Sequence, residues 1–317
     1  MGKYILKRLG LAAVVIVLTM FLLGLLVHLV PGDPVKIILG PRASESLSRV
    51  VRAEMQLDEP VLVQVWSFVR GAATGDLGRD FVSQLPVTSL IQQAFPHTVL
   101  LAVSGLGLAT LFGVPLGVYA ATRPNSWIDR LTAILSVSLI TVPPFVAGVF
   151  LLLLFAVELS LLPAIGAGEL GNTLDYLKHL VLPSTALAVT WMGYIARLVR
   201  TSMLEILGAN YSRTAFAFGL PRRQIFYKYA LKNAIIPTIA VLGVGLGTLI
   251  ANAVFVEIIF SRPGLGALIV DSISTRNYPI VRGGILVVVV IVVAANLVAD
   301  LSYRLLDPRI RFEAEGS

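Results

Sequence analysis

Few residues in this chain have the type and spacing that support chemistry. The three histidines, His28, His97 and His179, are far apart, no His-Glu-x-x-His motif occurs, and no acidic cluster suggests a metal ligand set. Cysteine is absent, which excludes disulfides and thiolate metal sites. We therefore expect neither a catalytic residue nor a metal site in this chain, and we interpret each histidine as an interfacial or packed residue.

Nucleotide chemistry is equally unsupported. No G-x-x-x-x-G-K-[ST] motif is present, since the one Gly-Lys pair is Gly2-Lys3. The run Gly243-x-Gly245-x-Gly247 resembles part of a dinucleotide fingerprint, but it lies inside an apolar segment with no strand before it. It is interpreted as helix packing, and any ATP hydrolysis must come from another polypeptide.

Isolated polar residues occur within the apolar segments. Glu257 and Asp300 would be proton-relay candidates, but two isolated acids make a weak relay, and hydrogen bonding between helices or exposure at the interface is favoured. Ser136, Thr141 and Thr190 are polar enough to line a translocation path, and equally able to bond their own helix backbone.

These segments belong to a membrane protein. The 317 residues are 56% hydrophobic and 14% charged, whereas ordinary soluble domains are about one quarter charged. Six runs satisfy the requirement for about 20 apolar residues per spanning helix. They are Leu9–Val30, Thr98–Ala121, Leu131–Val157, Leu180–Leu198, Ile235–Ile259 and Gly284–Leu305. Pro143-Pro144 should kink the third or make it line a cavity, because proline removes backbone donors.

Charge in the short loops sets the orientation. One side carries fifteen Lys and Arg residues and the other carries four, once the long segment 31–97 is left out. Both termini are therefore predicted to be cytoplasmic. The net charge of +7 comes mainly from this asymmetry and gives little support to nucleic-acid binding.

A basic stretch, Tyr211–Pro237, separates two of the apolar runs and is predicted to be cytoplasmic. Asn210 or Ser212 can cap a first short helix, Gly219 can end it, and Pro221 suits the first turn of a second helix. The first helix presents aromatic residues beside an arginine, which is typical of a docking element at a membrane surface. The candidate docking residues are Arg213, Thr214, Ala215, Phe216, Phe218, Gly219 and Leu220.

This stretch resembles the signature loop of permeases of bacterial ABC importers, in the dipeptide, oligopeptide and nickel branch. The branch pattern Tyr-x-Arg-Thr-Ala-x-Ala-x-Gly-Leu is matched by residues 211–220, and Ala-Leu-(Arg/Lys)-Asn-Ala-(Leu/Ile)-(Leu/Ile)-Pro by residues 230–237. Arg213 occupies the position of the general signature's Glu, so an ion pair from that Glu to the ATPase does not carry over, and a different contact is expected.

Motifs elsewhere extend the resemblance over nearly the whole chain. They are Pro31-Gly32-Asp33-Pro34, Leu57-Asp58-Glu59-Pro60, Gly75-Asp76-Leu77-Gly78, Phe260–Gly266, Arg276-Asn277-Tyr278-Pro279 and the ending Leu306–Arg311. Asn277 replaces the usual Asp. The resemblance implies that the outer segment helps to receive a substrate-binding protein; the alternative is a folded cap that steadies the helices.

The resemblance implies an all-α fold of the type I ABC importer permease in the bacterial inner membrane. Its expected organisation is an N-terminal spanning helix (1–30), an extracytoplasmic segment (31–97), a core permease domain (98–306) that includes the coupling loop 201–234, and a cytoplasmic tail (307–317). Expected partners are a homologous second permease, two ATP-binding subunits that carry ATP and Mg²⁺, a substrate-binding protein and membrane lipid.

The expected function is that of a non-enzymatic permease subunit of an ATP-driven importer of dipeptides or oligopeptides. Nickel and glutathione importers share these motifs and are alternatives. A rival from another class is an ion-coupled secondary transporter, which would need mid-membrane carboxylates and repeated halves. A purely structural membrane protein is a further alternative, and it would carry no solute.

Overall fold

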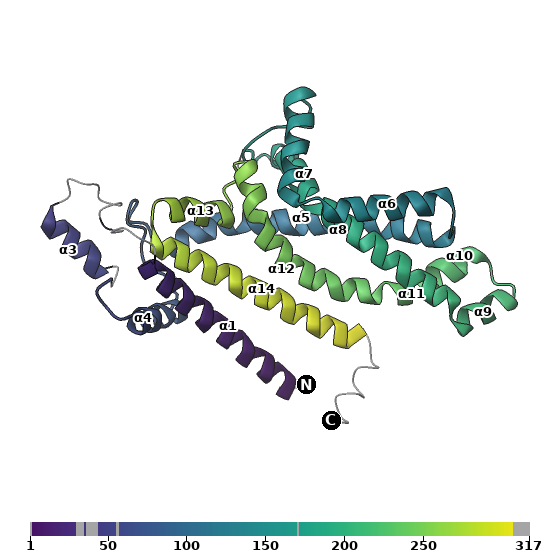
Figure 1. The fold of residues 1–317 in the computed structure, drawn as a ribbon, viewed down its shortest axis with the longest axis horizontal. Coiled ribbons are helices and arrows are strands. Elements are labelled where there is room, and N and C mark those ends of the chain that lie inside the picture. Colours follow the sequence, from purple (N-terminus) through teal and green to yellow (C-terminus); the bar gives the residue numbers. More distant parts are fainter. Residues whose placement is uncertain (1, 30–34, 36–43, 55–56, 170, 307–317) are drawn as a thin grey trace. The chain divides into compact units, whose positions relative to one another are not determined.

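A computed structural model describes residues 2–29, 35, 44–54, 57–169 and 171–306, and nearly all of its ordered elements are helices (Figure 1). The expected tail 307–317 and the Pro31-Gly32-Asp33-Pro34 motif lie outside the described residues. The chain divides into two compact units: residues 1–98 with 263–293, and residues 99–262 with 294–317. Helices α5 (Val87–Thr122) and α14 (Tyr278–Leu306) each contribute one part to each unit.

In the described part of the first unit there are four further helices: α1 (Gly2–Leu29), α3 (Glu45–Glu54), α4 (Val61–Ala73) and α13 (Leu265–Ser274). Helix α4 packs on α1, where a Cβ added at Gly24 would lie 3.1 Å from the Val61 side chain. The core of the unit joins the start of α5 to α13 and α14 through Val87, Ile91 and Leu265. The long outer segment is thus a helical layer built against membrane helices.

The second unit holds the remaining helices. They are α6 (Trp127–Thr141), α7 (Pro144–Leu151), the π-helical η1 (Leu152–Glu158), α8 (Thr173–Gly208), α9 (Asn210–Ala217), α10 (Arg222–Gln224), the π-helical η2 (Ile225–Ala230), α11 (Leu231–Ala234) and α12 (Ile236–Ile259). Helix α8 lies at the centre, because α6, α7, α9, α11 and α12 all contact it.

The membrane-spanning helices match the six predicted runs. Among the described residues, five helices are long and apolar enough to cross a membrane, and a sixth span results if α6 with α7 and η1 counts as one. Helices α5 and α8 have 36 residues each, or about 54 Å at 1.5 Å per residue. A bilayer core is only about 30 Å thick, so both helices extend well beyond it.

The third span is broken. The axes of α6 and of the α7–η1 segment differ by 100° across Val142 and Pro143. The predicted kink is therefore confirmed, and it has the cause expected, because Pro143 cannot continue the hydrogen bonding of α6. The Thr190 hydroxyl on α8 donates a hydrogen bond of 2.9 Å to the Val142 carbonyl, which the break leaves without a helical partner.

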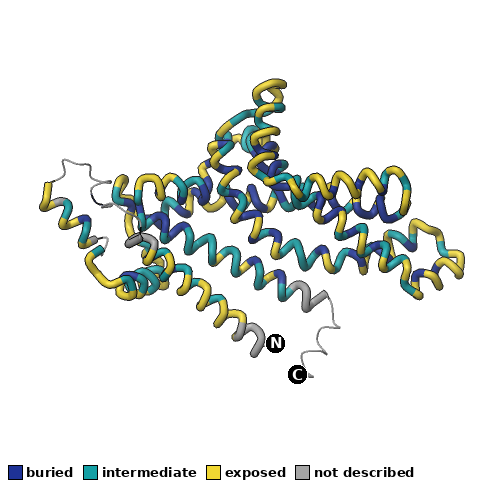
Figure 2. Tube along the Cα trace, viewed as in Figure 1, coloured by how far each residue is buried: buried dark blue, intermediate teal, exposed yellow. Residues whose placement is uncertain are grey.

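Small residues let α5 and α8 approach closely. A Cβ at Gly113 would lie 2.9 Å from the Met192 carbonyl oxygen, and one at Gly117 would lie 2.5 Å from the Ala196 carbonyl oxygen. Buried residues recur along both helices (Figure 2). Gly243 likewise packs directly against Ala299, and Gly245 packs against the Trp191 ring. The predicted role of Gly243 and Gly245 in helix packing is confirmed.

A buried arginine ties two elements together at the end of the second unit that is opposite α9. Arg262 is 1% exposed, and its guanidinium donates to the His179 carbonyl at 3.1 Å and to the Tyr176 hydroxyl at 3.2 Å. The same group lies over the Tyr176 ring. Burial lowers the pKa of Arg262 from its ordinary value, although the nearby Tyr176 and Glu257 oppose the shift. The turn after α12 is thus tied to the start of α8.

Candidate functional site

The candidate docking segment begins where α8 ends. Because α8 runs beyond the thickness of a bilayer, α9 lies outside the membrane, on the side that the charge distribution places in the cytoplasm. Between the two helices, Ala209 has an extended backbone (φ −70°, ψ 153°) that turns the chain sharply. Helix α9 is therefore an arm carried directly on α8, without a flexible linker.

Ser212 fixes the angle of this arm. Its side chain is fully buried, and its hydroxyl donates to the Ile206 carbonyl in α8 at 2.7 Å. The prediction that Asn210 or Ser212 would cap α9 is wrong: Ala209 occupies the N-cap position, and no side chain caps the helix. The Ser212 hydroxyl instead donates to a terminal carbonyl of the longer helix, so it ties α9 to α8 and does not cap α9.

Gly219 ends helix α9, as the sequence predicted. The residue has φ +72°, the left-handed conformation that glycine adopts without a Cβ clash. The Gly219 amide donates to the Phe216 carbonyl at 3.0 Å, and the Leu220 amide donates to the Ala215 carbonyl at 3.2 Å. These two bonds form a Schellman motif. The turn is consequently rigid and holds the residues before it in one orientation.

Aromatic side chains occupy the tip of the arm. Phe218 is 82% exposed, and Phe216 is 40% exposed and packs edge-on against Phe226, with ring centroids 6.5 Å apart. Of the other predicted docking residues, Arg213, Thr214 and Gly219 are exposed, Leu220 is half-buried, and Ala215 is buried against the rest of the segment. An exposed phenylalanine on a rigid turn is a feature of a protein-binding surface.

The return half of the segment is anchored in the core. Pro221 precedes α10 as its N-cap and is followed by the π-helical η2 and by α11, so the predicted second helix forms with a π-helical stretch inside it. Ile225 and Ala230 are completely buried. Ala230 and Ala234 belong to a cluster that also contains Ile195, Val199 and Met203 of α8 and Val118 of α5. The return half of the arm is thus packed directly against α5 and α8.

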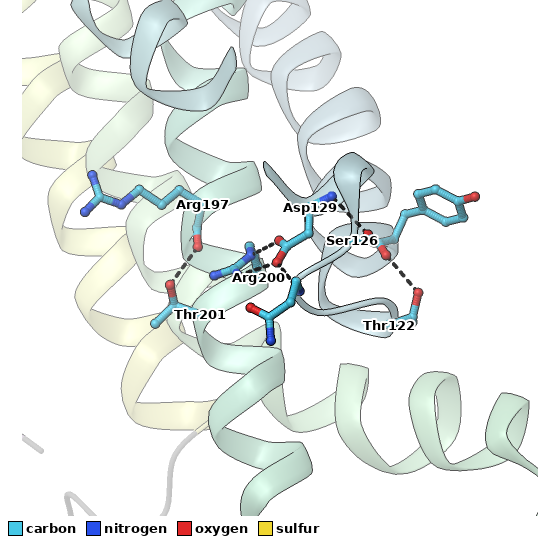
Figure 3. A network of polar contacts seen from close by, with 8 residues as sticks. Thr122, Ser126, Asp129, Arg197, Arg200 and Thr201 are labelled. Atoms are coloured by element: carbon cyan, nitrogen blue, oxygen red, sulfur yellow. Dashed lines mark hydrogen bonds and ion pairs between the residues drawn. The ribbon is translucent and has the colours of Figure 1, made fainter. Parts of the chain in front are cut away.

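An ion pair strengthens the base of α8 (Figure 3). Arg200 donates through Nη2 to Asp129 Oδ2 at 2.8 Å and through Nε to Oδ1, while the Asn125 amide donates to Oδ2 at 2.9 Å. Asp129 is 3% exposed. The bidentate pairing of Arg200 with Asp129 holds the α5–α6 turn against α8.

A cavity of about 560 Å³ lies in the second unit among α6, α7, α8, α12 and α14. Its polar or aromatic lining residues are Thr190, Trp191, Tyr194, Thr248, Asn252 and Asp300. Of the three path candidates, Thr190 lines this cavity. Ser136 is buried where α6 packs on Gly193, and the Thr141 hydroxyl bonds the Ser138 carbonyl of its own helix.

On the first unit, two motifs that are far apart in sequence meet at a buried carboxylate. Asp80 is 6% exposed and accepts from the Val82 and Ser83 amides at 3.0 Å each, from the Ser83 hydroxyl and from Asn277 Nδ2. Burial raises the pKa of Asp80, but the four hydrogen bonds outweigh it and hold the pKa below its ordinary value of 3.8. An amide suits position 277 because it can donate to this carboxylate.

Two family models match the chain. Residues 113–312 match "Binding-protein-dependent transport system inner membrane component", and residues 1–102 match "Binding-prot-dependent transport system membrane comp, N-term". The chain belongs to this family. Membership makes it a multi-pass, non-catalytic permease subunit of an ABC importer in the bacterial inner membrane, and it implies an ATPase and a binding protein as the other components.

Relatives and solved structures agree with this assignment. The chain is 37% identical over 314 residues to the glutathione transport system permease protein GsiC of Shigella flexneri serotype 5b, and 36% identical to that of Escherichia coli K12; each alignment covers 99% of this chain and 100% of the relative. A MetNI methionine ABC transporter chain in an inward-facing conformation matches with a TM-score of 0.58 at 19% identity. That match covers 69% of this chain and 96% of the other. The structural likeness establishes the permease fold.

Proposed function

We propose that this chain is the permease subunit of an ATP-driven importer for glutathione or a similar short peptide. In this proposal α9 and the Schellman turn dock on one ATPase subunit. A homologous second permease forms the other half of the translocation path and docks a second ATPase. The observation that carries the docking proposal is the 82% exposure of Phe218 on a rigid, core-anchored arm.

The docking contact differs from an ion pair through a glutamate. Arg213 stands on the exposed side of α9, and Phe218 extends from its end. A phenylalanine that fills a pocket on the ATPase would supply most of the binding energy. Arg213 would form an ion pair with an acidic residue at the rim of that pocket. The ATPase surface that receives this chain is therefore expected to combine an apolar pocket with a carboxylate.

Coupling follows from differential binding. Nucleotide can shift the transporter only if the closed pair of ATPases fits one permease conformation better than the other. The arm is fixed to α8 by Ser212 and packed on α5 and α8 by η2 and α11. A displacement imposed at Phe218 thus reaches the cavity that Thr190 and Tyr194 line on α8, which we propose as this subunit's part of the path.

The preference for glutathione rests on the relatives. Dipeptides and oligopeptides remain the second solute class, because glutathione is itself a short peptide and the sequence motifs are shared across the branch. The relevant test compares uptake of labelled glutathione, dialanine and Ni²⁺ by vesicles that contain the complete transporter. Glutathione uptake above the other two supports the proposal, and uptake of Ni²⁺ alone contradicts it.

Phe218→Asp tests the docking role in the same vesicles. Because Phe218 is exposed, the substitution should change the free energy of unfolding by less than about 0.5 kcal/mol. Loss of a central aromatic contact of about 2 kcal/mol would weaken ATPase binding about 30-fold. Val82→Asp, at a 74% exposed position of the first unit, is the matched control. Normal ATP-driven uptake by Phe218→Asp would contradict the docking proposal.

A further inference from the structure

A second site is suggested by an arginine on the first unit that has no acidic partner among the residues that the structure describes. Arg282 lies one turn into α14 and donates through Nη2 to Gln64 Oε1 on α4 at 3.0 Å. Its Nε is buried and has no hydrogen-bond acceptor in the described part of the chain. A half-buried cation with no counter-charge bonded to it in the described part of the chain is costly, so an external anion would stabilise this arrangement.

Gln64 is itself fixed. It is 1% exposed, and its Nε2 donates to the Glu59 carbonyl at 2.9 Å, which leaves Oε1 to face Arg282. Because a neutral amide holds the guanidinium in place, the arginine is positioned without being neutralised. Arg282 has five N–H donors, and one of them is accounted for by Gln64.

Arg282 and Gln64 line a pocket of about 270 Å³ in the first unit. The same pocket is lined by Ser67, Tyr278 and Asp76, and Asp76 brings a second, opposite charge. Asp76 Oδ1 accepts from the Gly78 amide at 2.9 Å, and its other oxygen has no hydrogen-bond partner among the described residues. One small pocket therefore contains a cation and an anion, each held by a neutral group and neither paired with the other.

This arrangement is complementary to a small molecule that carries both charges. A carboxylate can accept from Arg282, and an ammonium group can donate to Asp76. The volume is just below the range of about 300–1,000 Å³ of drug-sized sites, so the occupant is small or is the end of a larger molecule. Charge distribution places this end of α14 outside the cytoplasm.

We propose that the pocket between Arg282 and Asp76 is an extracytoplasmic binding site for a zwitterionic amino acid or short peptide. The site belongs to the first unit and is separate from the cavity on α8. It goes beyond the proposed transport of glutathione, because it would bind dialanine whether or not dialanine is carried.

The test uses the absence of cysteine from the chain. Ser67→Cys places one thiol in the pocket, and the rate of its reaction with a neutral methanethiosulfonate is measured for the full transporter in phosphatidylcholine nanodiscs. Dialanine at about ten times its Kd should slow the reaction about tenfold, by mass action. N-acetyl-dialanine and dialanine amide, which each lack one charge, should protect far less.

Three further substitutions, each made in the Ser67→Cys background, complete the test. Arg282→Gln and Asp76→Asn should each abolish protection by dialanine. Asp76→Asn keeps an oxygen for the Gly78 amide and is exposed, so it should fold normally. Arg79→Gln removes an exposed positive charge from the same loop and should leave protection unchanged. The labelling rate of the thiol is measured independently of solute uptake. A negative result for dialanine binding would therefore not contradict the proposed transport.

Two results would overturn the proposal. One is equal protection by all three peptides, or protection that survives Arg282→Gln and Asp76→Asn. The other is slowing by phosphatidylethanolamine in the nanodisc without any effect of dialanine, which would make the pocket a lipid headgroup site.

Discussion

Single residues decide how the outer and inner ends of the molecule are held. At the outer end, Asp80 carries a buried negative charge that several hydrogen bonds stabilise, one of them from Asn277. Its folded pKa lies below 3.8, so the unfolded state binds protons more readily. The stability contributed by Asp80 is therefore fully present above that ordinary value and is lost as pH falls through the folded value.

Asn277→Asp should reverse this pH dependence. Two carboxylates in contact cannot both ionise without repulsion, so one pKa of the pair should rise above its ordinary range. The variant should be less stable than the native protein at pH 7 and should gain stability on acidification towards pH 5. Thermal unfolding in nanodiscs at several pH values measures both effects.

Asp80→Asn combined with Asn277→Asp serves as the control, because it restores one carboxylate and one amide. It should recover most of the lost stability at pH 7. An Asn277→Asp variant that matches the native protein at every pH would contradict the proposed contact.

At the inner end, Arg200 and Asp129 should behave as a coupled pair. Arg200→Gln alone leaves the buried Asp129 carboxylate without its partner and should cost about 3 kcal/mol, whereas Asp129→Asn leaves the partly exposed Arg200 and should cost less. The double variant should cost less than the two single variants together, by about 1–3 kcal/mol. Arg197→Gln, at an exposed arginine one turn away (Figure 3), should cost less than about 0.5 kcal/mol. Additive costs for the pair would show that it does not hold α8.

At the scale of elements, the arm is defined by the ends of its helices. A Cβ at Gly219 and one at Gly208 would both meet open space, but only Gly219 has a positive φ. Gly219→Ala should therefore cost about 1–2 kcal/mol through backbone strain. Gly208→Ala, at the last residue of α8 where φ is not positive, should instead stabilise by about 0.4–1 kcal/mol.

Amide hydrogen exchange measures this difference locally. The amides of Gly219 and Leu220 close the Schellman motif, so their exchange should accelerate in Gly219→Ala and stay unchanged in Gly208→Ala. Equal exchange in the two variants would mean that the turn is not fixed by its glycine.

The elements predicted from sequence are those that depend on local pattern. Apolar runs long enough to span a membrane predicted the spans, and Pro143 predicted the break in the third. The glycine at 219 predicted the end of α9. Contacts across the chain were not predictable in this way: Arg200 and Asp129 are 71 positions apart, and Asn277 and Asp80 are 197 apart. A count of charges in the loops contains no information about such partners.

The same limit applies to the candidate site. The docking residues could be identified because aromatic, basic and glycine residues are unusual between two apolar runs. The side chain that fixes the arm was misassigned: Ser212 suits an N-cap, but its hydroxyl reaches back to Ile206 of the preceding helix. The zwitterion pocket left no local signal, because α4, the turn at Gly78 and α14 each supply only part of it.

At the scale of the whole molecule, the chain works only as one component of an importer. We expect it to co-purify with an ATPase and with a homologous six-span permease when solubilised gently from its native membrane. Uptake should stop when ATP is removed and should persist when the proton gradient is collapsed. The opposite dependence would favour an ion-coupled transporter that works alone.

The central claim is that the arm ending at Phe218 meets the ATPase. Because the chain has no cysteine, Phe218→Cys introduces one thiol at the tip, and Val82→Cys introduces one at an exposed position of the first unit. A short thiol-to-amine cross-linker is added to each purified transporter complex, and the adducts are identified by mass spectrometry. We expect an adduct with the ATPase from position 218 and none from position 82. Absence of the ATPase adduct from position 218, in a complex that contains the ATPase, would contradict it.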